Sequence, residues 1–125
     1  MENLGYYRFP TINRDLVVFV CEDDLWSYDL AEDRLARLTS NYGAVSTPKI
    51  SPDGKNIAFV GSEDGDTEIY VMPSLGGPAK RLTYLGSMVK VLGWKNNFSL
   101  QALTPLSRTE MNWVFHVDIA EDQGI

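Results

Sequence analysis

The sequence predicts an all-β fold of short antiparallel strands, and three observations support this prediction. Aromatic residues are frequent, with three Trp, six Tyr and five Phe among many Val, Ile and Leu. Gly, Pro, Asn and Asp clusters separate short apolar runs along the whole chain. No segment keeps the i, i+3, i+4, i+7 apolar spacing of an amphipathic helix between capping residues. With 125 residues, of which 44% are hydrophobic, the chain has single-domain size and can bury a core.

The stretch 47–83 is the clearest unit and predicts four strands joined by tight turns. Pro52 presets φ for the first turn, Gly54 supplies a positive φ, and we expect Asp53 to hydrogen-bond within that turn. The second strand is apolar on both sides, with Phe59 on one face, which suits a sheet covered on both faces. The four strands are expected at residues 48–51, 56–61, 68–72 and 79–83.

Residues 9–39 repeat this unit with shorter loops. Matching positions share residue type, and the pairs are Ile12 and Ile50, Phe19 and Phe59, Trp26 and Tyr70, and Leu38 and Leu82. The first turn of this copy is Asn13-Arg14-Asp15, a shorter turn in which Asn13 can adopt the left-handed conformation.

A weaker third copy begins at residue 92. Gly93-Trp94 takes the place of Lys49-Ile50, and strands are expected at 99–103 and 114–117. Phe115 then shares one position with Trp26 and Tyr70, which predicts packing between neighbouring copies rather than a ligand-stacking platform.

A four-stranded unit repeated about every 40 residues is typical of β-propeller blades. The sequence therefore predicts a partial β-propeller over residues 1–125. It would hold two complete four-stranded blades, at 9–39 and 47–83, and an incomplete third blade at 92–125. Since propellers commonly have about four to eight blades, we expect the remaining domains of a longer protein, or other copies, to complete the ring.

Several stretches resemble a known family. The second copy reads Pro48-Lys49-Ile50-Ser51-Pro52-Asp53-Gly54-Lys55, followed by the segments 68–72 and 76–83. This pattern is similar to the WD-type blade repeat of TolB-like proteins and tricorn proteases. The segments 5–12, 18–26 and 37–40 resemble the N-terminal region of the tricorn protease family.

This resemblance implies a role in proteolysis. In that family the propellers precede a PDZ domain and a C-terminal serine peptidase domain. The assembly is a cytosolic oligomer that trims peptides, and its propellers are thought to gate peptide entry. None of the family's catalytic positions falls in the matched part, so we expect a non-catalytic scaffold and peptide gate. The alternative is a stand-alone TolB-like module that binds a protein partner.

The residue types favour no catalytic, metal or cofactor site. The sequence has no Gly-x-Ser-x-Gly turn with a Ser nucleophile for which His116 could act as general base. Acidic neighbours disfavour a reactive thiolate at Cys21. The acidic segment 63–66 lacks the ligand spacing of a calcium loop. A net charge of −6 with scattered Lys and Arg argues against nucleic-acid and membrane partners. The start of the chain lacks a signal-peptide pattern, so we expect a cytoplasmic location.

Acidic loops between the second and third strands form the remaining candidate site. Blade geometry places these loops on the same edge of the ring as the connections between blades, and Tyr42 and Ser46 lie in such a connection. The edge would attract peptides with free amino termini or basic side chains, or it would only keep the surface soluble. The candidate peptide-binding residues are Glu22, Asp23, Asp24, Glu63, Asp64 and Asp66.

Overall fold

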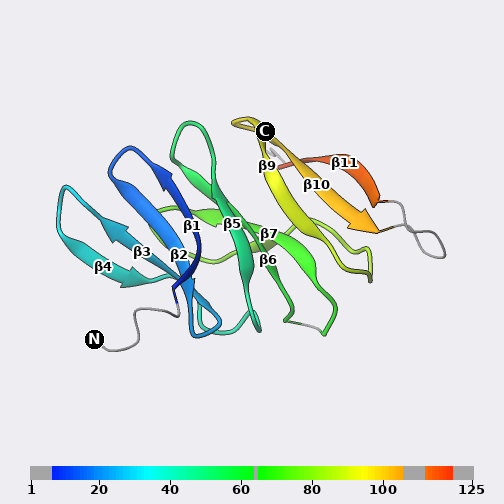
Figure 1. Cartoon of the computed structure of the whole chain (residues 1–125), viewed down its shortest axis with the longest axis horizontal. Helices are drawn as coiled ribbons and strands as arrows, with labels where there is room; N and C mark the ends of the chain where they lie inside the picture. The colour runs from blue at the N-terminus through cyan, green and yellow to red at the C-terminus, as the bar shows by residue number, and fades with distance from the viewer. Residues whose placement is uncertain (1–6, 64, 106–111, 120–125) are drawn as a thin grey trace.

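The computed structural model describes residues 7–63, 65–105 and 112–119. Three antiparallel sheets lie side by side like blades of a fan (Figure 1). The first sheet contains β1 Arg8–Asn13, β2 Leu16–Cys21, β3 Asp24–Asp29 and β4 Arg34–Arg37. The second contains β5 Ser46–Ile50, β6 Asn56–Gly61, β7 Glu68–Pro73 and β8 Lys80–Arg81. The third contains β9 Lys90–Asn96, β10 Ser99–Pro105 and β11 Asn112–Asp118.

The strand order is that of successive propeller blades. Each four-stranded sheet runs in chain order from β1 to β4 and from β5 to β8, and the third sheet places β10 between β9 and β11. The predicted all-β partial propeller is therefore confirmed. The blade limits 9–39, 47–83 and 92–125 stay a prediction, because residues 106–111 and 120–125 lie outside the described part. None of the described residues forms a helix that could cross a membrane.

Strand registers show that the copies are equivalent position by position. Phe19 pairs with Trp26 in the first sheet, as Phe59 pairs with Tyr70 in the second. In the third sheet Phe115 pairs with Ala102, so the predicted equivalence of Trp26, Tyr70 and Phe115 is confirmed.

The strands β1, β5 and β9 form the inner edge of the fan, since β5 lies against both of the others. In β1 and β5 the pairing register shifts at equivalent points. Phe9 and Thr47 take positive φ values of 54° and 46° there. Each is followed by a proline, Pro10 or Pro48, which donates no backbone hydrogen bond.

Two apolar clusters fill the spaces between neighbouring sheets. The strand β6 contributes to both, because its alternate residues point to opposite faces. Phe59 packs toward the first sheet and is fully buried, whereas Val60 packs toward the third. The predicted sheet with two covered faces is confirmed for the second blade.

Two local expectations were wrong. In the first turn of the chain Arg14, with φ of 56°, takes the left-handed conformation instead of Asn13. The Asn13 side-chain amide donates to the carbonyl oxygens of Ser51 and Pro52, each at 3.1 Å, and so links the turns of two blades. The fourth strand of the second blade was expected at 79–83 but is only β8, and the backbone N–H of Ala79 just before it donates to the Tyr42 hydroxyl at 3.1 Å.

Candidate peptide-binding rim

Loops between the second and third strands of each blade lie beside the connections to the next blade. The backbone N–H of Val45, in the first connection, donates to the carbonyl oxygen of Asp23 at 3.1 Å. The backbone N–H of Ser62 donates to the carbonyl oxygen of Tyr42 in the same connection at 2.7 Å. The two acidic loops therefore share one edge of the fan, which we call the acidic rim.

The predicted rim residues differ in exposure. Glu22, Asp23, Glu63 and Asp66 are exposed, and Glu22 and Asp23 form a tight turn with positive φ values of 52° and 71°. Asp64 lies outside the described residues.

Asp24 is placed differently from its neighbours, because it begins β3 and its side chain is buried. One carboxylate oxygen lies 2.5 Å from an Arg37 guanidinium nitrogen, and the other accepts a hydrogen bond from the Thr39 hydroxyl at 2.8 Å. The Thr39 oxygen also accepts the backbone N–H of Leu25 at 3.0 Å. We call Asp24, Arg37 and Thr39 the first-blade cluster, and its carboxylate is occupied by internal partners.

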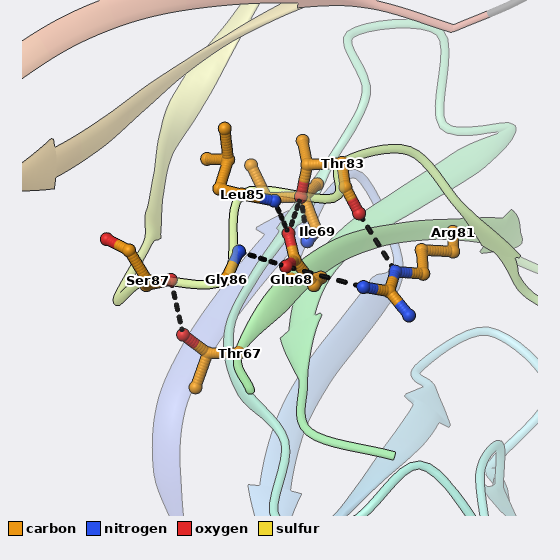
Figure 2. Close-up of polar contacts among 8 residues, drawn as sticks. All are labelled: Thr67, Glu68, Ile69, Arg81, Thr83, Leu85, Gly86 and Ser87. Atoms are coloured by element: carbon orange, nitrogen blue, oxygen red, sulfur yellow. Dashed lines mark hydrogen bonds and ion pairs between the residues drawn. The ribbon is translucent and has the colours of Figure 1, made fainter. Parts of the chain in front are cut away.

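The second blade repeats this arrangement with Glu68, Arg81 and Thr83, the second-blade cluster (Figure 2). The Thr83 hydroxyl donates to Glu68 at 2.5 Å and accepts the backbone N–H of Ile69 at 3.0 Å. The Arg81 Nε atom donates to the Thr83 carbonyl oxygen at 2.9 Å, and an Arg81 terminal nitrogen lies 3.4 Å from Glu68.

Glu68 makes two contacts that Asp24 lacks. Its carboxylate accepts the backbone N–H groups of Leu85 and Gly86 at 2.9 and 2.8 Å, which fixes the connection to the third blade (Figure 2). Burial would raise the pKa of Glu68, but the hydrogen bonds from Thr83, Gly86 and Leu85 and the charge of Arg81 outweigh it. The pKa therefore lies below its ordinary value.

The second connection is also tied to the acidic rim directly. The Thr67 hydroxyl donates to the carbonyl oxygen of Ser87 at 3.2 Å, and the Asp66 carboxylate lies beside Gly86. Tyr42 and Ser46, which were expected in the connection beside the rim, contribute to the core and to a strand. The Tyr42 ring packs edge-on against Phe59 with centroids 5.9 Å apart, and Ser46 begins β5.

The two clusters were not predicted from the sequence, although their Arg and Thr residues belong to a segment that repeats in both blades. In both blades the fourth strand ends at the Arg of an Arg-Leu-Thr sequence, and an acidic residue begins the third strand. The Arg and Thr side chains lie close enough to that acidic residue to bind it.

The opposite edge of the fan carries the predicted Asp53 turn. The Asp53 carboxylate accepts the Ser51 hydroxyl at 2.7 Å and the backbone N–H of Lys55 at 3.0 Å, and these bonds lower its pKa. The Asn97 side-chain oxygen accepts the backbone N–H of Asp53 at 2.8 Å. Asp53 therefore stabilises its own turn, as predicted.

The described residues bring together no catalytic or metal-binding group. His116 is exposed, and its Nε2 lies 3.3 Å from the Gln101 amide nitrogen. Within the ranges that the structure describes, no three His, Cys, Asp or Glu side chains could hold a metal ion.

Comparison with known proteins places this geometry in a family context. The family model described as the tricorn protease N-terminal beta propeller domain matches residues 4–124. Tricorn protease homolog 1 of Streptomyces coelicolor is 39% identical over 108 residues, which cover 86% of this chain. A putative tricorn-like protease N-terminal subunit of Sulfurisphaera tokodaii is 37% identical over 114 residues, which cover 87%.

Solved structures agree with these matches. A crystal structure of the tricorn protease superposes on 87% of this chain with a TM-score of 0.72 and 28% identity, over 12% of its own length. A putative TolB from Agrobacterium tumefaciens, 22% identical, shares the fold with a TM-score of 0.74 over 90% of this chain and 42% of its own. The chain spans 10% of the Streptomyces relative and 57% of the Sulfurisphaera relative.

Proposed function

Because the chain belongs to the family of tricorn protease N-terminal β-propeller domains, we propose that it is a non-catalytic scaffold and peptide gate for proteolysis. Its catalytic partner would be the peptidase part of a tricorn-type protease. The Sulfurisphaera relative is named as an N-terminal subunit of such a protease, which supports a division of labour between the propeller and the peptidase.

One observation carries the gating part of this proposal: exposed carboxylates gather on the acidic rim. Glu22 and Asp23 come from the first blade, and Glu63 and Asp66 from the second. Asp64 belongs to the same loop by sequence and stays in the hypothesis. A surface with one sign of charge raises the local concentration of oppositely charged ligands. Peptides with basic side chains or a free amino terminus would therefore reach this edge faster than acidic peptides.

The buried clusters supply the scaffold part. Each one joins the start of a third strand to the end of the same blade, and the Glu68 carboxylate also holds the backbone at Leu85 and Gly86. These bonds would hold the strand ends and the connection next to the acidic rim in place.

A binding assay tests the steering. We expect a fluorescent basic peptide to bind this chain more tightly than an acidic peptide of equal length, and the difference should shrink as added salt screens the rim. Changing Glu22, Asp23, Glu63 and Asp66 together to Lys should invert the preference. Asp24 is left unchanged, because its replacement would break the first-blade cluster.

A matched control changes acidic residues on the opposite edge. The backbone N–H of Leu30 donates to the carbonyl oxygen of Asp15, so the turns around these residues lie together. Asp15→Lys with Glu32→Lys alters the net charge on that edge, and both residues are exposed. This variant should keep the preference for basic peptides. If it weakens the preference as much per charge as the rim variant does, net charge and not the acidic rim attracts the peptide.

The isolated chain should not hydrolyse peptides. No described residues form a nucleophile, base and oxyanion-hole arrangement. Incubation with fluorogenic peptides checks this expectation. Turnover that survives purification and disappears in a His116→Ala variant would contradict the non-catalytic role.

A further inference from the structure

The two spaces between neighbouring blades are packed in a similar way, which is clearest in the first. The earlier blade contributes aliphatic side chains, such as Val20 and Leu25, and the later blade contributes larger ones, such as Phe59 and Tyr70. In the second space Ile69 and neighbouring aliphatic residues lie on the earlier side, and the later blade contributes Trp94 and Phe115 beside smaller side chains such as Ala102. Phe59 and Tyr70 stack with centroids 5.6 Å apart.

The outward face of the first blade carries the same residue types that the second blade turns toward the first. Phe19 and Trp26 occupy the positions of Phe59 and Tyr70, as the strand registers show. No blade of the described chain covers them. We call this surface face A, and a pocket on it is lined by Tyr7, Phe19, Cys21, Trp26 and Leu35.

Face A has an open space beside Cys21, whereas the equivalent position in the second blade, Gly61, is closely packed. Cys21 stands at the position of Gly61, where a Cβ would lie only 3.1 Å from both the Tyr42 carbonyl oxygen and the Tyr70 ring. Tyr42 comes from the connection that leaves the first blade. In the first blade the matching space is the open pocket beside Cys21.

The outward face of the third blade carries the same residue types that the second blade turns toward the third. Leu103 pairs with Val114, at the positions of Val60 and Ile69, and both side chains point away from the second blade. Val114 is 51% exposed. We call this surface face B, defined by Gln101, Leu103, Val114 and His116.

We propose that face A of one chain binds face B of a second copy, head to tail. Each copy carries both halves of an interface that the fold already uses twice within one chain. Successive blades are related by rotation, so an aromatic face meets an aliphatic face and not its own equivalent. A heterologous contact of this kind forms a closed ring when the rotation closes. Two copies together contain six sheets, and six blades lie within the usual number for a propeller ring.

Light scattering across a range of protein concentrations tests the inference. The wild-type chain should pass from monomer to dimer as its concentration rises. Leu35→Glu places a charge on face A, and Val114→Glu places one on face B, where Leu35 and Val114 are 58% and 51% exposed and can change without disturbing the core. Burying an unpaired charge should raise the dimer Kd about a hundredfold or more in either variant.

A mixing experiment establishes the direction of binding. An equal mixture of the two variants retains one intact pair of faces and should form dimers again, although each variant alone is monomeric. Recovery on mixing also shows that both variants are folded. If Val114→Glu alone still dimerises, face A binds face A and the head-to-tail arrangement is wrong.

Thiol labelling gives an independent readout at face A. Cys21 should react more slowly with a maleimide as the dimer forms, and Leu35→Glu should abolish this protection. Leu75→Glu is the matched control, since Leu75 is 93% exposed on the hairpin between β7 and β8 and belongs to neither face. It should dimerise like the wild type. A wild-type chain that stays monomeric at every concentration, with Cys21 equally reactive throughout, would overturn the proposal.

Discussion

The first and second blades have the same strand order and the same register, yet their outer surroundings differ. In the second blade both faces of the sheet are covered, and Phe59 is fully buried. In the first blade only one face is covered, and the matching Phe19 is half-buried beside an open pocket. The same residue type at the same position therefore contributes differently to stability, because neighbouring blades decide its burial.

A second difference lies in the two buried carboxylates. Asp24 and Glu68 bind equivalent Thr and Arg side chains, but only Glu68 also accepts two backbone N–H groups of the following connection. Glu68, whose side chain is one methylene group longer than that of Asp24, thus also links its blade to the following connection. Variants of the two blades can separate these effects.

The largest difference should come from the matched phenylalanines. Phe59→Ala should lower the free energy of unfolding by about 3–5 kcal/mol, since it leaves a cavity in the core. Phe19→Ala should cost about 1 kcal/mol at low protein concentration, because its ring is already partly exposed. Urea unfolding of both variants measures the two values. Equal losses would mean that the outward face of the first blade is covered in solution even when the chain is dilute.

A smaller difference should separate the two carboxylates. Glu68→Gln should lower the free energy of unfolding by about 2–3 kcal/mol, because an amide NH2 replaces an acceptor opposite a backbone N–H and the ion pair between Glu68 and Arg81 is lost. Asp24→Asn should cost about 1 kcal/mol, since the Arg37 side chain is 53% exposed and water screens the pair. Chemical denaturation at neutral pH checks the order. A larger loss for Asp24→Asn would show that the connection contacts of Glu68 add little.

The smallest effect should be the pH dependence of the second-blade cluster. The pKa of Glu68 is lower in the folded chain than its ordinary value of 4.5, so its stabilisation is fully present above that value. The stabilisation is then lost as the pH falls through the folded pKa. Stability measured from neutral to acidic pH should therefore fall less steeply in Glu68→Gln than in the wild type.

Asp53 provides the comparison for this measurement. Its pKa is also lowered, chiefly by the Ser51 hydroxyl, from an ordinary value of 3.8. Asp53→Asn should therefore reduce only the loss at the more acidic end of the curve. If Glu68→Gln leaves the whole curve unchanged, the Glu68 carboxylate has the same proton affinity in the folded and unfolded chain.

The sequence predicted much of the fold because turn residues and alternating apolar residues act locally. Pro52 and Gly54 marked a turn whose hydrogen bond from Gly54 to Ser51 is present at 2.8 Å. Phe59 was correctly placed in the core, and in the third sheet Gly93 and Trp94 pair with Gln101 and Leu100 as Lys49 and Ile50 pair with Ala58 and Ile57. Such features depend on neighbouring residues and on the period of the strand.

Long-range side-chain contacts could not be predicted in the same way. Asn13 was expected to adopt the left-handed conformation, but its amide reaches Ser51 and Pro52, 38 and 39 residues away. Asp24 was grouped with the acidic loop, although Arg37 and Thr39 draw it into the blade. Sequence spacing alone does not show which polar side chain receives a partner from another strand.

The proline residues of the inner strands bear on how a peptide could move past this edge. An extended peptide can attach to a sheet by adding a strand along a free edge, where it pairs with a continuous row of N–H and C=O groups. In β1 and β5 that row is interrupted by Pro10 and Pro48, and the backbone turns at Phe9 and Thr47 just before them. An extended peptide would therefore find no continuous row of backbone groups to pair with at this edge, as the proposed peptide gate requires.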